Sequence, residues 1–270
     1  MPARGTREAR VLPKEISTAL YRGLVLGLLL LLWAQLLFSA IQKSPTIDES
    51  NHLTRGYAYL RTGDLRLSRD EGHPPLFNLI CALPLLALRD LELPTERASW
   101  QAGFRNAFAV EFLFGEGLPV EQVFFMGRLP VMLATLLLAA LVMRWAGELY
   151  GRWGAILALA FCAFDPNLIA HGRLITTDVA ATFGYALAVY VFVRYLDKPS
   201  ALWLALSGLA LGIAQGLKFS ALLLVLMLGL LGTVACLRPS SPLRWPGRPR
   251  VWGRGWLSGV LALAGAMITI

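Results

Sequence analysis

Most of the side chains that could do chemistry lie in three short polar segments. The first, residues 48–52, reads Asp-Glu-Ser-Asn-His, and Thr46 with Glu49 three residues later predicts a capped helix start. At about 100° per residue, Asp48 and His52 lie on one face of that helix and Glu49 does not. A reachable carboxylate can act as a general base, whereas an acid in a first turn also complements the helix dipole. The spacing leaves both interpretations open for Asp48, and for Glu49 it favours the cap.

The rest of this helix divides into the same two faces. Leu53, Gly56 and Tyr57 form an apolar stripe that is expected to face lipid or protein. The opposite face continues from His52 to Arg55 and is predicted to be polar.

The second polar segment ends in His73, which two prolines follow. Proline disfavours helical backbone in the residue before it, so His73 is expected in extended chain at the start of the apolar stretch 74–88. At about 1.5 Å per residue that stretch is too short for a ~30 Å hydrocarbon core, and Pro84 interrupts it. It is predicted to be a helix at the membrane interface. His73 could be a solvated histidine beside a helix start or a ligand-binding group.

The third polar segment, residues 171–178, reads His-Gly-Arg-Leu-Ile-Thr-Thr-Asp and leads into an apolar run. It supplies His171, Arg173 and Asp178. The acid is either a helix-start residue that complements the dipole or a catalytic group. The preceding segment 165–167, Asp-Pro-Asn, is typical of a turn.

The amino-acid composition indicates that part of this chain lies in the hydrocarbon core of a membrane. Hydrophobic residues make up 56% and charged residues 16%, against roughly a quarter charged in a soluble domain. The net charge of +8 comes mostly from arginines beside apolar runs, where they set orientation and meet anionic lipid. We therefore exclude a nucleic-acid partner. The three cysteines are scattered and form no metal or disulfide pattern. There is no glycine-rich phosphate loop and no cofactor is implied, while a divalent metal ion stays open.

The long apolar runs predict an all-α, polytopic transmembrane helix bundle. The expected spans are 23–41, 129–143, 153–164, 179–193, two spans within 201–237, and the start of a further span at 255–270. The first run exceeds the core of a cleaved signal peptide, about 7–15 residues, so we interpret it as an uncleaved span. The last run is apolar to the final residue, which predicts a fragment of a longer protein.

The run 201–237 would be about 55 Å long as a single helix, nearly twice the hydrocarbon core. It must therefore turn, and the expected place is near 215–218. Lys218 is the only charged residue in this run. It could snorkel to the headgroups or bind an anionic group.

The distribution of Arg and Lys predicts the orientation, because short cytoplasmic segments are enriched in both. Residues 1–22 form a basic cytoplasmic N-terminus, 23–237 a transmembrane core that includes a first outer loop 43–128, and 238–254 a basic cytoplasmic linker. The short inner turns hold Arg144, Arg152, Arg194 and Lys198, whereas the short outer segments hold little beyond Arg173 and Lys218. The three polar segments then lie at the outer face of the cell inner (plasma) membrane.

Eight short motifs follow one another between residues 20 and 237. They are Asp48-Glu49, Gly63-Asp64, His73-Pro74-Pro75-Leu76, Arg128-Leu129-Pro130, Asp165-Pro166-Asn167, His171-Gly172-Arg173, Thr177-Asp178 and Gly216-Leu217-Lys218-Phe219-Ser220. Together and in this order they resemble bacterial members of the protein O-mannosyltransferase superfamily. These are GT-C glycosyltransferases, and the aminoarabinose transferase of lipid A is a relative.

The resemblance implies a helical membrane enzyme that takes a monosaccharide from a polyprenyl-phosphate donor. The acceptor would be a hydroxyl of a protein or glycolipid at the outer face. It implies Asp48 and Asp178 as acids of the site, and Lys218 and His73 as the groups that hold the lipid phosphate. The other candidates come from their place on the predicted outer side: Glu49 as a third catalytic acid, and His52, His171 and Arg173 for the lipid phosphate and sugar. The chain departs from the aminoarabinose transferase at His73, because that enzyme has lysine before its prolines.

Two other classes remain as alternatives. A transporter predicts charges near the midplane and broken helices in matching places of two halves. A non-catalytic membrane subunit predicts no common location for the titratable residues. The enzyme predicts that Asp48, His73, Asp178 and Lys218 converge.

Overall fold

The computed structural model describes residues 16–68, 73–88, 91–115 and 118–237. Over these residues the chain is built of helices and connecting turns, which confirms the predicted all-α helix bundle. The expected linker 238–254, the span 255–270 and most of the basic N-terminus fall outside the described residues.

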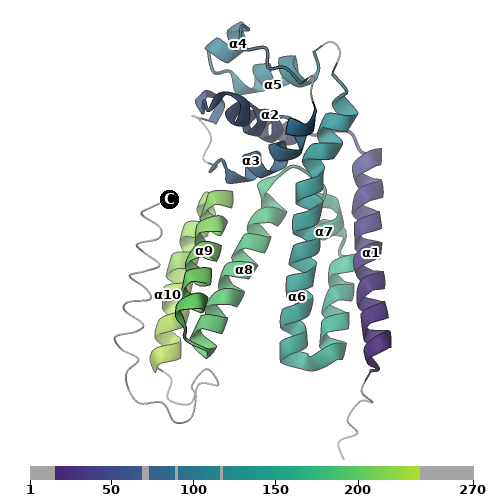
Figure 1. Cartoon of the computed structure of the whole chain (residues 1–270), viewed down its shortest axis with the longest axis vertical. Coiled ribbons are helices and arrows are strands. Elements are labelled where there is room, and N and C mark those ends of the chain that lie inside the picture. Colours follow the sequence, from purple (N-terminus) through teal and green to yellow (C-terminus); the bar gives the residue numbers. More distant parts are fainter. Residues whose placement is uncertain (1–15, 69–72, 89–90, 116–117, 238–270) are drawn as a thin grey trace, which may run out of the picture.

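Figure 1 shows long helices side by side, with several short helices gathered over one end. The α-helices are α1 (Thr18–Gln42), α2 (Ile47–Thr62), α3 (Leu76–Ala82), α4 (Ala98–Gln101), α5 (Arg105–Leu113), α6 (Val120–Phe164), α7 (Pro166–His171), α8 (Thr177–Asp197), α9 (Ala201–Leu217) and α10 (Leu222–Leu237). Three 3₁₀ turns complete them: η1 (Arg66–Ser68), η2 (Leu83–Ala87) and η3 (Phe219–Ala221). We call the end of the bundle that is covered by α2–α5 the loop end.

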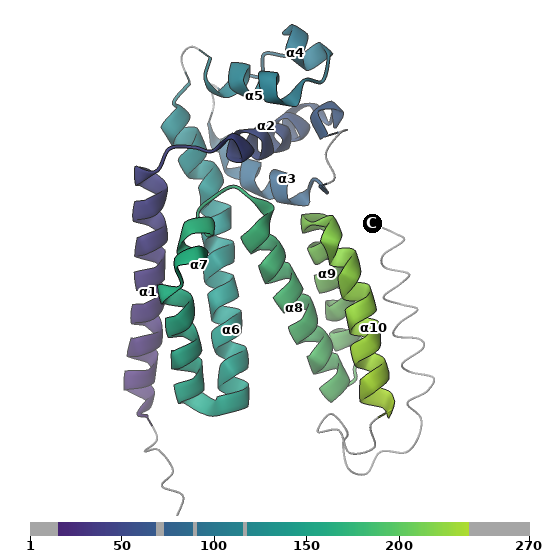
Figure 2. The ribbon, with the colours of Figure 1, turned by 180° about the vertical axis from the view of Figure 1, so that it is seen from behind.

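Three of the described helices, α1, α6 and α8, are long and apolar enough to cross a membrane. Helix α6 has 45 residues and reverses at Gly151, whose φ of 74° lies in the left-handed region that favours glycine. Its two arms therefore run antiparallel (Figures 1 and 2). The second arm, 152–164, is only about 20 Å long, and α7 continues toward the loop end. Helices α9 and α10 are apolar and shorter.

The predicted turn within 201–237 is confirmed. Helix α9 ends at Leu217, Lys218 is extended (φ −157°, ψ 135°), and η3 leads into α10. The predicted capping box is also present, since Thr46 accepts from the Glu49 amide and Glu49 accepts from the Thr46 amide.

The long helices pack as two groups. In the first, α1 packs against both arms of α6 through a buried apolar cluster. In the second, α8, α9 and α10 pack around residues such as Phe192 and Leu211. Away from the loop end the groups are joined by polar contacts, in which Arg144 donates to the Tyr190 hydroxyl (2.9 Å) and Arg194 pairs with Glu148. The short turns predicted to be basic thus lie at the end opposite the loop end (Figure 2).

The cover at the loop end has its own apolar core. Tyr57 of α2 stacks on Phe112 of α5, with ring centroids 5.7 Å apart. Gly56 lets α2 approach α3 closely, because a Cβ there would lie 2.0 Å from the Asn78 carbonyl oxygen. The apolar stripe of α2 therefore faces protein, which is one of the two predicted environments. Pro84 ends α3, and the chain continues as η2.

The helix that contains the predicted span 129–143 begins earlier, at Val120. Arg128, which precedes this span and from there could have snorkelled to the headgroups, is instead buried, with 2% of its surface exposed. The reason is an acidic partner from α2, described next.

Candidate active site

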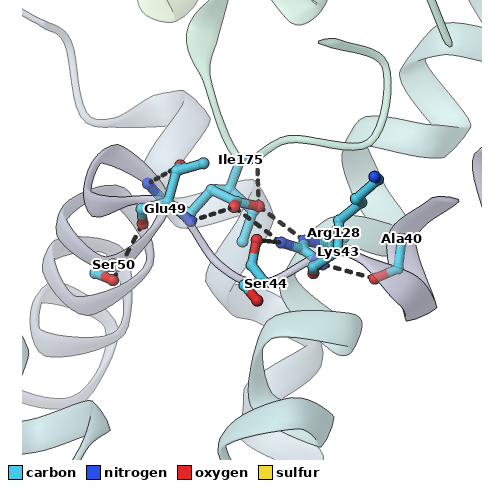
Figure 3. A network of polar contacts seen from close by, with 8 residues as sticks. Ala40, Lys43, Ser44, Glu49, Ser50, Arg128 and Ile175 are labelled. Atoms are coloured by element: carbon cyan, nitrogen blue, oxygen red, sulfur yellow. Dashed lines mark hydrogen bonds and ion pairs between the residues drawn. The ribbon is translucent and has the colours of Figure 1, made fainter. Parts of the chain in front are cut away.

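A buried ion pair ties the N-terminal end of α2 to α6 (Figure 3). The Arg128 guanidinium donates to both carboxylate oxygens of Glu49, over 2.8 Å and 2.9 Å. It also donates to three backbone carbonyls, that of Ala40 (2.6 Å) in the last turn of α1 and those of Lys43 (3.0 Å) and Ser44 (3.3 Å) after this helix. Arg128 thus gathers the end of α1, the start of α2 and its own helix at one point.

Glu49 is fully buried and fully engaged. Besides Arg128 it accepts from the backbone amides of Thr46 (2.8 Å) and Ile175 (3.2 Å), the latter in the segment before α8. Burial alone would raise the pKa of Glu49, but the bonds and charge of Arg128, with the two amides, outweigh it and lower that pKa. Glu49 is therefore held as a carboxylate whose oxygens already have partners.

Asp48, the preceding residue, is exposed. The two neighbouring acids lie in different environments, since Asp48 meets solvent and Glu49 is enclosed. The negative charge of Asp48 favours the protonated forms of His52 and Arg55, so it lies within electrostatic reach of both.

His52 is buried, although it lies on the polar face of α2, opposite the apolar stripe. Its Nδ1 lies 2.9 Å from Nη2 of Arg55 and 2.7 Å from Oδ1 of Asn78. The guanidinium can only donate, so an unprotonated Nδ1 accepts from Arg55, whereas the tautomer with a proton on Nδ1 donates to Asn78. Burial first, then the charge of Arg55, lowers the pKa of His52 to about 4. At neutral pH His52 is an uncharged, positioned imidazole.

Asp178 and Lys218 form an ion pair between the start of α8 and the end of α9. Nζ of Lys218 donates to Oδ1 of Asp178 over 2.8 Å, and the side chains are 29% and 57% exposed for Lys218 and Asp178, respectively. Two turns further along α8, the hydroxyl of Tyr185 lies 2.6 Å from that of Ser220 in η3.

His73 lies between these two sets of residues. Its ring centroid is 6.2 Å from that of His52. Burial first, and then the positive charges of Lys218 and Arg55, lower the pKa of His73, while Asp178 opposes them. His73 thus faces groups from α2 on one side and from the α8–α9 pair on the other. At the loop end, four separate stretches of sequence are therefore linked in series: Asp48 acts electrostatically on His52, the rings of His52 and His73 are neighbours, and the Lys218–Asp178 pair acts electrostatically on His73.

The other two residues of the predicted site lie elsewhere. His171 is exposed at the end of α7. Arg173 is half-buried, and its pKa is lowered by burial and then by Arg128, with Glu49 opposing. Arg173 therefore belongs to the surroundings of the buried Glu49–Arg128 pair. Its Nε and Nη1 are buried without a hydrogen-bond partner among the described residues.

The described residues hold no group of three or more His, Cys, Asp or Glu side chains arranged to bind a metal ion. The groups that converge are instead two exposed acids, several cations and a neutral imidazole. Such a set can take a proton from a hydroxyl and stabilise an anion that forms nearby.

Comparison with known families adds to this geometry. Residues 118–243 match the dolichyl-phosphate-mannose-protein mannosyltransferase family. The match begins just before α6 and includes α7 to α10, and so contains Arg128, Asp178 and Lys218. It confirms the resemblance over this part of the chain, whereas Asp48 and His73 precede it. No curated protein and no solved structure gives a match.

Together with the apolar helices, the mannosyltransferase match supports a membrane glycosyltransferase of the mannosyltransferase type. The family implies a lipid-linked sugar donor and an acceptor in a membrane setting.

Sequence reasoning missed two contributors to this region. Arg128 stood only in the motif Arg128-Leu129-Pro130, with no role assigned, and its partner Glu49 lies 79 residues earlier. Asn78 was hidden inside an apolar stretch, where a lone amide among Leu, Ile and Phe was the available signal.

Proposed function

We propose that the protein transfers a monosaccharide, of the mannose type, from a polyprenyl-phosphate donor to a hydroxyl of a protein or glycolipid. The observation that carries the proposal is the convergence of Asp48, His73, Asp178 and Lys218 at the loop end of membrane helices. The family match over α6–α10 supports the same reaction class.

In this reaction Asp48 acts as the general base. The acceptor oxygen bonds to the anomeric carbon while the bond from that carbon to the phosphate oxygen breaks. The acceptor proton passes to Asp48, and the lipid phosphate leaves with the electron pair. Asp48 suits this role because it is exposed and adjoins the cationic groups.

Lys218 stabilises the departing phosphate, and His73 adjoins it. An ammonium group placed where negative charge develops lowers the barrier. Asp178 pairs with Lys218 in the structure, so we assign it the task of holding the ammonium in place rather than that of a second base. In this proposal the donor phosphate shares Lys218 with Asp178.

Glu49 has a positioning role in the proposal. Its oxygens are taken up by Arg128 and two backbone amides, so it has no lone pair directed at a substrate. It holds the start of α2, and with it Asp48, against α6. His52 also has a positioning role, since its ring is held by Arg55 of α2 and by Asn78 of α3.

We also infer that the loop end faces outward from the plasma membrane. Support comes from the basic turns at the opposite end of the bundle, which the positive-inside rule places in the cytoplasm. The charged side chains of the described long helices lie near their ends, which does not favour the transporter alternative.

The test uses the full chain in lipid nanodiscs with radiolabelled mannosyl polyprenyl phosphate. The acceptors are a protein fraction and a glycolipid fraction, each prepared without detergent from membranes of the cells that express the protein. Transfer of label to either fraction, dependent on the protein, is the expected result. The proposal is contradicted if the label stays on the donor lipid with both fractions. It is also contradicted if the label is transferred equally well without the protein.

A further inference from the structure

Two polar contacts lie one beyond the other on the face of α8 that meets the α9–α10 junction. Asp178 contacts Lys218, and Tyr185 contacts Ser220. Asp178 and Tyr185 are seven residues apart in one helix, which separates them by about 10 Å along its axis. Helices α8, α9 and α10 run side by side in both ribbon views (Figures 1 and 2).

The Tyr185–Ser220 contact is unusual in its surroundings. It is exposed, and it lies further from the loop end than the Asp178–Lys218 pair, beside the apolar residues of the helices. Two hydroxyls offer two O–H donors, and their mutual 2.6 Å bond uses one. A polar donor that faces hydrocarbon is costly unless it finds a partner.

The surface beside this contact is apolar. Exposed side chains follow Ser220 at the start of α10, where Leu222 is 54% and Leu223 61% exposed. An alkyl chain can lie against these leucines, and Phe219 adds a further exposed ring. The region thus combines one ammonium, one available hydroxyl donor and an apolar surface.

We propose that Tyr185 and Ser220 are a specificity-determining part of the donor site, and that they bind the phosphate of an isoprenoid lipid from its membrane side. The inference rests on the proposed function. A phosphodiester has two non-bridging oxygens. Lys218 meets one, and the hydroxyl pair donates to the other, with Tyr185 donating to Ser220 and Ser220 donating to the phosphate. The lipid chain then runs along α10 and the sugar lies toward the loop end, near Asp48.

The chemistry of a lipid phosphate could also be met by a phospholipid headgroup or by free phosphate. The exposed leucines favour a phosphate with an alkyl chain over free phosphate, and the proposed function favours an isoprenoid chain over a phospholipid. The experiment therefore compares undecaprenyl phosphate, phosphatidylglycerol and inorganic phosphate as ligands.

The variants are Ser220→Ala and Tyr185→Phe in the full chain, in nanodiscs of neutral lipid. Tyr190→Phe is the matched control, because it also removes a tyrosine hydroxyl bonded between helices, at the far end of α8. Binding is measured as the rise in melting temperature on adding each ligand. The apparent KM for mannosyl polyprenyl phosphate is measured separately.

We expect undecaprenyl phosphate to stabilise the wild type most. Ser220→Ala and Tyr185→Phe should bind it about tenfold more weakly, the effect of ~1.4 kcal/mol, with KM raised to match and kcat nearly unchanged. Tyr190→Phe should lower the melting temperature without ligand and keep the wild-type response to ligand.

The inference is overturned if both variants bind undecaprenyl phosphate as the wild type does, since the hydroxyls would then only join two helices. It is also overturned if phosphatidylglycerol or inorganic phosphate stabilises the wild type equally well, or if undecaprenyl phosphate does not stabilise it. The measurement of ligand binding by melting temperature does not require sugar transfer. A wild type that binds undecaprenyl phosphate through these hydroxyls but transfers no sugar would refute the proposed function and leave the inference standing.

Discussion

Replacing Glu49 by glutamine should destabilise the protein strongly, although the change removes only one charge. The Arg128 guanidinium would then lie buried, 2% exposed, against a neutral amide. Breaking a buried ion pair by removing one partner costs about 3–5 kcal/mol. With roughly 2–4 °C per kcal/mol for a chain of this size, the apparent melting temperature should fall by about 6–20 °C. Arg128→Met should do the same, and it also leaves carbonyls such as that of Ala40 without their donor.

The assay is thermal unfolding in nanodiscs, compared across the variants at one scan rate because membrane proteins commonly unfold irreversibly. Asp64→Asn is the matched control. Asp64 pairs with Arg66 over a similar 2.7 Å, but the side chains are about one-third exposed, so its loss should cost less than about 1 kcal/mol.

The pH dependence of this pair has a defined sign. The folded-state pKa of Glu49 lies below its ordinary value, so its stabilising contribution is present above that ordinary value and is lost as the pH falls through the folded pKa. Wild-type stability should therefore decline on acidification more than that of Glu49→Gln. If Glu49→Gln melts like the wild type but transfers no sugar, the reasoning is refuted and Glu49 is a reacting acid.

Three further predictions concern the donor side and the orientation. Transfer activity should follow the order Lys, then Arg, then Gln at Lys218, with Gln losing about 10²–10³-fold, because a guanidinium fork only partly replaces a point charge; Asp178→Asn should lower activity less, and wild-type turnover in Lys218→Gln would remove this residue from the site. His73, whose pKa is lowered, should gain charge only below its ordinary pKa, so the KM for the donor should fall as the pH drops below about 6.5; His73→Lys should abolish that dependence, and an unchanged slope in this variant would exclude His73 as its source. A cysteine placed at Thr95 should be labelled from the outer face in cells, and labelling only from the cytoplasm would reverse the inferred orientation.

Much of the fold could be predicted from hydrophobic patterning alone. The apolar runs gave the long helices, since hydrocarbon-facing residues leave a signal in every turn of helix. The turn at Lys218 followed from length, because a single helix over 201–237 would overshoot the membrane. The capping box of α2 followed from the local pair Thr46 and Glu49, whose partners are three residues apart.

Residues of the site could be predicted only where the sequence immediately around them marks them out. Lys218 stood out because it is the only charged residue in 201–237, and Asp48 because it shares a face with His52 at a predicted helix start. The Glu49–Arg128 pair could not be found in this way, since its members lie 79 residues apart and each has an ordinary local explanation. His52 was expected on a polar face, yet α2 is buried on that face as well, against Asn78 of α3. Helical periodicity distinguishes faces, but it does not say which later element covers them.

The most direct test of the central claim is sugar transfer by Asp48→Asn in nanodiscs with mannosyl polyprenyl phosphate. The amide cannot accept the acceptor proton, so the rate should fall by about 10²–10⁴-fold. The melting temperature and the binding of undecaprenyl phosphate should stay at wild-type values, because Asp48 is exposed and has no part in holding the phosphate. Wild-type transfer by this variant would contradict the assignment of Asp48 as the general base.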